Sequence, residues 1–233
     1  MNVSGVSAPE RTVSRNPIAV VLLGMLGGYL AASILVVLWV ELFGKGGVGP
    51  SLASSVGLWV GFVGSTTYEA RSRQENVSEL VQFRARWVPD LAVGGVAGLA
   101  LQLGVIPVMY LLLEPATGPL EVDGAAQNLT KDVAGLQWIA ALLIIGVGAP
   151  IAEEIFFRGL VRRLIQERWG IAAGVIGSSV FFAATHFQLV QFPGLLAAGL
   201  AFAALAATTG RLGPSIICHI AFNLTTLVQL MAR

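Results

Sequence analysis

Charge is scarce in this chain of 233 residues. Only 12% of the residues are Asp, Glu, Lys or Arg, whereas 55% are hydrophobic. Soluble domains are about one quarter charged, so the composition excludes an ordinary water-soluble domain. The net charge is +1, without the basic excess that nucleic-acid binding requires, and no nucleic-acid partner is expected. The single cysteine, Cys218, excludes an intramolecular disulfide.

Long apolar runs are abundant instead. Several approach the roughly 20 residues that a helix needs to cross a bilayer. The run that begins at Pro17 is too long for the apolar core of a signal peptide, so it is expected to remain as the first helix. The expected fold is all-α, a polytopic transmembrane helix bundle of about seven helices, or eight with a further crossing or re-entrant piece. The runs predict helices at 17–42, 51–68, 91–113, 136–160, 170–190, 193–210 and 212–232.

A single membrane domain, 17–233, is expected to follow a polar tail at 1–16. The segment 69–90 carries four acids and four arginines and is interpreted as a solvated connector, and 114–135 as a loop. Eleven Lys and Arg residues fall on one side of the alternating topology and three on the other. This bias predicts that the tail, 69–90 and 158–168 are cytoplasmic. The expected location is the plasma (inner) membrane of a prokaryote, and seven helices would put the C-terminus outside.

Ionisable side chains inside membrane helices are costly, so each one is a functional candidate. Glu41 follows the end of the first apolar run and is expected at the membrane interface. The chain has only two histidines, and both lie in predicted membrane helices. The complete set of candidates is Glu41, Glu153, Glu154, Arg158, His186 and His219.

The fourth predicted helix carries two adjacent carboxylates. Glu154 and Arg158 are four residues apart, so they share one helix face and can pair. Glu153 is rotated by about 100° and can face elsewhere. Pro150, just before them, cannot donate to the carbonyl of Gly146 and is expected to loosen the helix, as happens where a helix lines a cavity at membrane depth.

Two later helices repeat this spacing. Phe182 and His186, in FFAATHF, share one face, and so do His219 and Asn223, in HIAFN. Either histidine alone could simply hydrogen-bond a neighbouring helix. Together, however, three helices offer two carboxylates, two imidazoles and an amide, a convergence that packing does not readily explain.

This set of groups fits a hydrolase. A carboxylate and an imidazole can deprotonate water and later protonate a leaving amine, and a second imidazole and an amide N–H can stabilise an oxyanion. No serine lies in a nucleophile motif, and Cys218 is rotated by about 100° from the face of His219. The alternative is a zinc ion held by Glu153, His186 and His219. Because H-E-x-x-H is absent, such a site would be assembled across helices.

Three motifs resemble, in order, those of the CPBP family of intramembrane proteases. This is the CAAX-protease and bacteriocin-processing family, also called the Abi or Rce1-like family. The similarity covers about residues 135–230, which the resemblance implies to be the catalytic core. The motifs are EEIFFR (Glu153–Arg158), FAATH (Phe182–His186) and HIAFN (His219–Asn223).

The resemblance implies a role for each matching position. Glu153 would activate water with the assistance of His186, and His219 and Asn223 would stabilise the oxyanion. Members of the family are described as metalloproteases, but a mechanism without metal is also considered for them. Glutamate-activated water is the preferred reading here, and zinc stays open.

The remaining motif residues would support the site. Glu154 and Arg158 would hold the first motif in place, with Glu154 a further catalytic candidate, and Phe182 would support the second motif. The expected substrate is a membrane-associated protein or peptide: a prenylated CAAX protein, a leader peptide, a bacteriocin precursor or a signalling peptide. The partners are thus the lipid bilayer and this substrate, and the sequence does not specify the oligomeric state.

Glu153 and His186 can meet only at the same depth in the membrane. If the fourth helix ended at Arg158, His186 would lie roughly 24 Å further from the cytoplasmic face, at 1.5 Å per residue. A helix that continues to about Glu167 places Glu153 about 22 Å from its end, so a longer helix is predicted. His219, only about eight residues into its helix, is too shallow unless that helix tilts or starts in a recessed loop.

Two other classes of function compete with a protease. A small transporter or proton relay could use Glu and His as an ion path, but the chain has no internal repeat or paired broken helices. A non-catalytic scaffold or immunity protein could retain the motifs, although intact motifs favour an enzyme.

Overall fold

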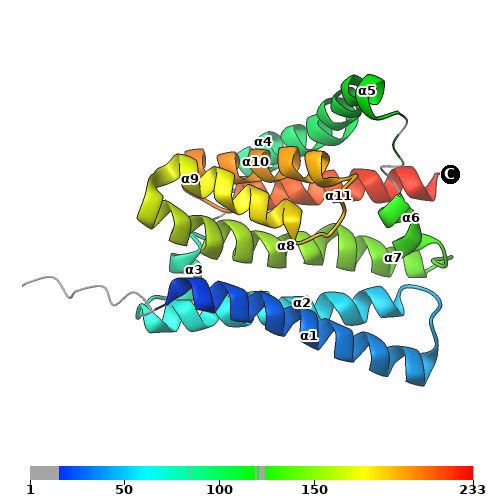
Figure 1. The fold of residues 1–233 in the computed structure, drawn as a ribbon, viewed down its shortest axis with the longest axis horizontal. Helices are drawn as coiled ribbons and strands as arrows, with labels where there is room; N and C mark the ends of the chain where they lie inside the picture. Colours follow the sequence, from blue (N-terminus) through cyan, green and yellow to red (C-terminus); the bar gives the residue numbers. More distant parts are fainter. Residues whose placement is uncertain (1–15, 85, 119, 121–123, 233) are drawn as a thin grey trace, which may run out of the picture.

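The computed structural model describes residues 16–84, 86–118, 120 and 124–232, and the regular structure in these residues is helical (Figure 1). Several helices join end to end through π-helical turns, labelled η. The elements are α1 (Pro17–Phe43), α2 (Gly49–Ser72), α3 (Val77–Leu80), α4 (Trp87–Ala100), η1 (Leu101–Val105), α5 (Ile106–Thr117), α6 (Gly124–Thr130), α7 (Gln137–Ala141), η2 (Leu142–Gly148), α8 (Ala149–Glu153), η3 (Glu154–Val161), α9 (Arg162–Ala184), α10 (Phe192–Thr209) and α11 (Gly213–Met231).

Five of these helical segments are long and apolar enough to cross a membrane: Pro17–Phe43, Trp87–Thr117, Gln137–Ala184, Phe192–Thr209 and Gly213–Met231. The third of them contains two helices, because Gly170 turns the chain back with a φ of 87°. With α2, which is rich in Ser and Gly, the bundle has seven long helices among the described residues. The prediction of an all-α integral membrane protein with about seven helices is confirmed.

The two candidate carboxylates lie on the central helix. In Figure 1 the α1–α2 hairpin (blue and cyan) runs along one side, and the continuous rod from α7 to the start of α9 (green to yellow) runs next to it. The rod contacts α2 on one side and α11 on the other through α8 and η2, and α4 packs on the far side of α11. Phe62 of α2 stacks on Phe156 of η3 at 4.5 Å, and Phe157 meets Phe182 edge-on at 5.2 Å. Aromatic packing thus fixes the rod within the bundle.

The depth comparison correctly predicted the length of the fourth helix. The rod stays helical beyond Arg158 to Trp169, the residue before the Gly170 break. The fifth helix was predicted to reach residue 190, which is wrong: it ends at Ala184. Phe187 has a φ of 54°, outside the helical region, so the chain turns away and His186 lies in that turn.

Two predicted connections differ in part from the structure. Most described residues of 71–89 are exposed, as expected for a solvated connector, but Glu69 and Asp90 at the ends of the segment are at most 2% exposed. Their charges are paired: Glu69 Oε1 lies 2.7 Å from Arg73 Nε, and Asp90 Oδ1 lies 2.6 Å from Arg211 Nη1. The predicted loop at 114–135 contains the short helix α6. The polar tail lies outside the described residues, apart from Asn16.

The start of α11 is recessed, as the shallow position of His219 required. The backbone N–H of Leu212 donates to the carbonyl of Gln82 at 3.2 Å, so the segment 69–90 contacts the start of α11. Leu212 is 1% exposed, and the first residues of α11 are buried as well. The chain therefore begins α11 inside the protein, and His219 reaches the depth of the carboxylates.

We predict that the α1–α2 hairpin depends on direct backbone contact. A Cβ at Gly61 would lie 2.2 Å from the carbonyl oxygen of Gly24, whereas a Cβ at Gly64 would meet nothing within 4 Å. Gly61→Ala should cost about 1–3 kcal/mol through overpacking and lower Tm, and Gly64→Ala should leave Tm unchanged or slightly raised. Cys218 is buried and is the only cysteine, so its labelling by a thiol-reactive dye on heating measures Tm. Equal Tm values for the two variants would contradict this close approach.

Candidate active site

Pro150 shapes the helix ahead of the two carboxylates. Over η2 the hydrogen bonds span five residues, and the N–H of Ala149 donates to the carbonyl of Ile144. In that register the next carbonyl, of Ile145, would receive an N–H from Pro150, which has none. Asn223 fills the position, because its Nδ2 donates to Ile145 O at 3.0 Å. The missing N–H of Pro150 thus leaves a carbonyl that holds the side-chain amide of Asn223 against the central rod. This carbonyl belongs to Ile145, whereas in an α-helix the carbonyl without a donor would be that of Gly146.

Glu154 is the hub of the site. Its side chain is fully buried, and its two oxygens have partners from two helices. Oε1 lies 2.9 Å from His219 Nδ1 and 3.0 Å from Arg158 Nη1. Oε2 accepts a hydrogen bond from the hydroxyl of Ser215. Because Arg158 is a permanent cation and Ser215 donates, this environment stabilises the ionised carboxylate.

Arg158 is enclosed as completely as its partner. It is 0% exposed, and its Nη2 donates to the carbonyl of Gly199 at 3.2 Å. The guanidinium carbon lies 4.4 Å from the ring centre of Phe182 and 5.3 Å from that of Phe202. The faces of both rings carry partial negative charge and attract the cation. The predicted pairing of Glu154 with Arg158 is therefore present, and Phe182 contributes to it.

His219 connects the two carboxylates. Its Nδ1 faces Glu154, and its Nε2 lies 3.8 Å from Glu153 Oε2. Since an ionised carboxylate only accepts hydrogen bonds, the proton on Nδ1 is assigned to the bond with Glu154. The ring also stacks on Phe202, with centroids 4.4 Å apart. Orientation and tautomer are thus both fixed, and Nε2 is directed toward Glu153.

His186 is held differently, in the turn that follows α9. Its Nδ1 lies 2.8 Å from the carbonyl of Phe182, so that nitrogen carries the proton and Nε2 is the free position. The ring also packs edge-on against Phe182 at 4.7 Å. His186 makes no hydrogen bond or ion pair with Glu153 or Glu154 among the described residues. The imidazole in contact with the carboxylates is His219.

One cavity of about 280 Å³ brings the candidates together. Glu153, His186, His219 and Asn223 all line it, whereas Glu154 and Arg158 lie behind its wall. Tyr29 of α1 lines it too, and its hydroxyl donates to the carbonyl of Thr185, the residue before His186. The structure thus separates the candidates into side chains that face the cavity and side chains that hold them from behind.

Comparison with known families adds to this geometry. The model of the family described as "Type II CAAX prenyl endopeptidase Rce1-like" matches residues 135–225. These residues form an Rce1-like domain. The match agrees with the range of about 135–230 expected from the motifs. No curated protein and no solved structure matched the chain.

The sequence analysis did not identify two residues of the Rce1-like domain that contact the site, Ser215 and Phe202. Ser215 precedes His219 by four residues, the same spacing that identified the other pairs, but serine is common in membrane helices and gave no signal by itself. Phe202 lies in the Ala-rich α10, where an aromatic residue indicates only packing. Neither the contact of Ser215 with Glu154 nor the stack of Phe202 on His219 could be read from one helix alone.

The side chains of the Rce1-like domain do not assemble a metal site. Across the described residues, no three His, Cys, Asp or Glu side chains lie close enough together to hold one ion. Of the three zinc candidates, Glu153 and His219 approach each other at 3.8 Å, whereas His186 is bonded to Phe182 O and makes no hydrogen bond or ion pair with either of them among the described residues. His219 Nδ1 is also occupied by Glu154. The arrangement does not fit the zinc alternative, and no step below passes through a metal.

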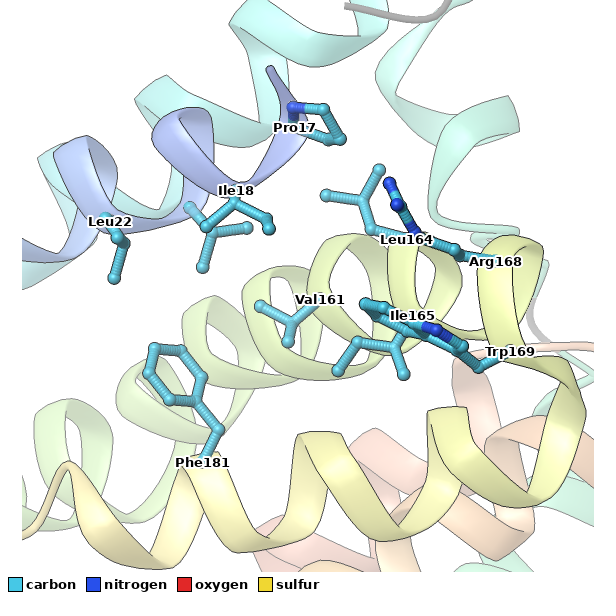
Figure 2. A pocket seen from close by; sticks show the side chains of 10 residues that line it. Pro17, Ile18, Leu22, Val161, Leu164, Ile165, Arg168, Trp169 and Phe181 are labelled. Atoms are coloured by element: carbon cyan, nitrogen blue, oxygen red, sulfur yellow. The ribbon is translucent and has the colours of Figure 1, made fainter.

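A second hollow lies between α1 and the rod. It is an apolar groove of about 250 Å³ beside Ile18, Leu22, Val161 and Phe181. Figure 2 shows these side chains facing one another, with Arg168 and Trp169 at one end. Among the described residues that line it, Arg168 is the one ionisable residue, and the others are apolar or aromatic.

We predict that Arg158 stabilises the fold by neutralising Glu154. Arg158→Met leaves a buried carboxylate without its cation and should cost about 3–5 kcal/mol, measured as a lower Tm in detergent. The double variant Glu154→Gln/Arg158→Met buries no charge and should recover much of that loss. A double variant no more stable than Arg158→Met would contradict this account.

Proposed function

We propose that the chain is an intramembrane endopeptidase that hydrolyses a peptide bond of a membrane-associated protein or peptide. One observation carries the proposal: the Glu153 carboxylate, 20% exposed, lies 3.8 Å from His219 Nε2 in a cavity that His186 and Asn223 also line. A partly exposed carboxylate next to one imidazole, in a cavity that a second imidazole also lines, is suited to activate water. The Rce1-like domain supports the same class of reaction.

In the proposed reaction Glu153 is the base. It removes a proton from a water molecule, and the resulting hydroxide attacks the carbonyl carbon of the scissile peptide bond. His186 assists, because its Nδ1–H is bound to Phe182 O and leaves Nε2 able to accept a proton. When the C–N bond breaks, the proton passes to the amine nitrogen, and the products are a carboxylic acid and an amine.

His219 and Asn223 are the proposed oxyanion donors. Because His219 Nδ1 is bonded to Glu154, its Nε2 is on the cavity side, where an N–H on this nitrogen would donate to the oxyanion. One Nδ2 hydrogen of Asn223 is used on Ile145 O, and the other is available. In this scheme Glu154 acts through His219, and Arg158 and Ser215 act through Glu154.

The substrate class belongs to the proposal as well. The description of the family names CAAX prenyl endopeptidases, so the first probe is a farnesylated CAAX peptide with an N-terminal fluorophore. The same peptide without the farnesyl group, leader peptides and bacteriocin precursors complete the panel. The proposed location, with the N-terminus in the cytoplasm, rests on the distribution of Lys and Arg.

We expect Glu153→Gln to abolish cleavage of these peptides. Loss of a general base typically costs about 10²–10⁴ in rate, and the amide retains the size of the carboxylate. Glu41→Gln, on the exposed end of α1, is the matched control and should retain full activity. The readout is product formation by mass spectrometry, with Tm as a check of folding. Equal cleavage by wild type and Glu153→Gln would reject the assignment.

Because Glu153, His186 and His219 do not form a metal site, we predict that a chelator does not reduce the cleavage rate. The purified protein, dialysed against EDTA and then against metal-free buffer, should cleave at the rate of the untreated protein. Elemental analysis of the same samples would establish how much zinc each contains. A loss of activity that added zinc restores would show that the side chains rearrange around a metal during catalysis.

A further inference from the structure

Three polar residues in the wall of the catalytic cavity come from α2, outside the Rce1-like domain. Ser51, Ser54 and Ser55 line the same cavity as Glu153 and are half-buried. Their spacing of three and four residues places them on one face of α2. This face explains why α2 is rich in serine although it lies among apolar helices.

These serines differ from other hydroxyl residues in the bundle. In membrane helices Ser and Thr usually donate to the carbonyl three or four residues earlier. Ser54 and Ser55 have such carbonyls within reach, but they form no hydrogen bond within the described part of the protein. The described residues that do form this bond are Ser33, Ser65, Thr66, Thr67, Ser72, Thr117, Thr130, Ser178, Ser179, Thr185, Thr208, Thr209, Thr225 and Thr226.

A peptide substrate needs such partners. A segment about to be hydrolysed must leave its helix, so that its peptide N–H and C=O groups lose their internal hydrogen bonds. In a cavity enclosed by apolar helices, each group left unpaired costs free energy. A serine hydroxyl can both donate and accept, so it can bind either kind of peptide group and is tolerant of substrate sequence.

The spacing of the serines matches an extended chain. Ser51 and Ser55 are one turn apart, which is about 6 Å along the helix axis at 1.5 Å per residue. Peptide groups along one edge of an extended chain repeat every two residues, or about 6.7 Å. A substrate strand lying along α2 would therefore present successive groups of the same edge to Ser51 and Ser55, with Ser54 beside them.

We propose that Ser51, Ser54 and Ser55 bind the main chain of an extended peptide substrate and hold its scissile bond against Glu153 and His219. This inference rests on the proposed peptidase function and adds a binding surface from the N-terminal half of the chain. The three serines are positioning residues for the reaction, because the proposed catalytic groups come from other helices that line the same cavity.

The test separates binding from chemistry. Ser54→Ala, Ser55→Ala and the double variant should raise KM for the farnesylated CAAX peptide by about 2- to 10-fold per hydroxyl, the worth of one net hydrogen bond, with kcat changed much less. In a Glu153→Gln background, the Kd for the same peptide, measured by fluorescence anisotropy, should rise in parallel. Thr67→Ala is the matched control, because Thr67 lies on α2 but donates to Val63 O at 2.7 Å; its KM and Kd should not change.

A main-chain contact has a further signature. Replacing one peptide bond of the probe by an ester removes its N–H, so for the bonded position Ser55→Ala should weaken the amide peptide but not the ester peptide. Equal weakening of both at every position scanned, or unchanged KM and Kd in the serine variants, would overturn the proposal while the peptidase function stands. If wild type neither binds nor cleaves any peptide of the panel, the peptidase function fails, and the serine proposal fails with it.

Discussion

The buried ion pair of Glu154 and Arg158 is the constraint on which the site depends. Two opposite charges without contact to water need hydrogen-bond and ring partners in addition to each other. Ser215 and His219 of α11, Gly199 of α10 and the ring of Phe182 on α9 provide most of these contacts, whereas Arg158 Nε has no hydrogen-bond partner among the described residues. Satisfying one pair therefore fixes three helices around the central rod, and the same contacts orient His219.

The central rod departs from α-helical geometry where the chemistry is placed. The π-helical turns η2 and η3 lie on either side of α8, which contains Pro150 and ends at Glu153. Such turns shift the register and leave a backbone group available, and they are frequent at functional sites. Here the available carbonyl of Ile145 anchors Asn223. A defect in the helix is thus used to attach a cavity residue, in agreement with the expectation that Pro150 opens the helix.

The long helices and the candidate ionisable residues could be predicted from the sequence, because a lipid bilayer requires long apolar helices and makes buried charges costly. Apolar runs predicted the long helices, and the scarcity of charge made Glu153, Glu154 and Arg158 stand out. The depth comparison extended the fourth helix beyond Arg158, because two groups can meet only at one level of the bilayer. The sequence did not reveal that some charges of the segment 69–90 are buried, because a buried charge can be neutralised by a partner distant in sequence, as Asp90 is by Arg211.

The sequence by itself determined the membrane class, the long helices and the set of ionisable residues, because hydropathy and i,i+4 spacing are local properties. Only the tertiary structure decided which groups touch. It joined His219 to both carboxylates, left His186 apart from them, and placed Ser215 behind the cavity and the α2 serines on its wall. The physical reason is that helix rotation and register follow from packing between distant segments, which no single stretch of sequence contains.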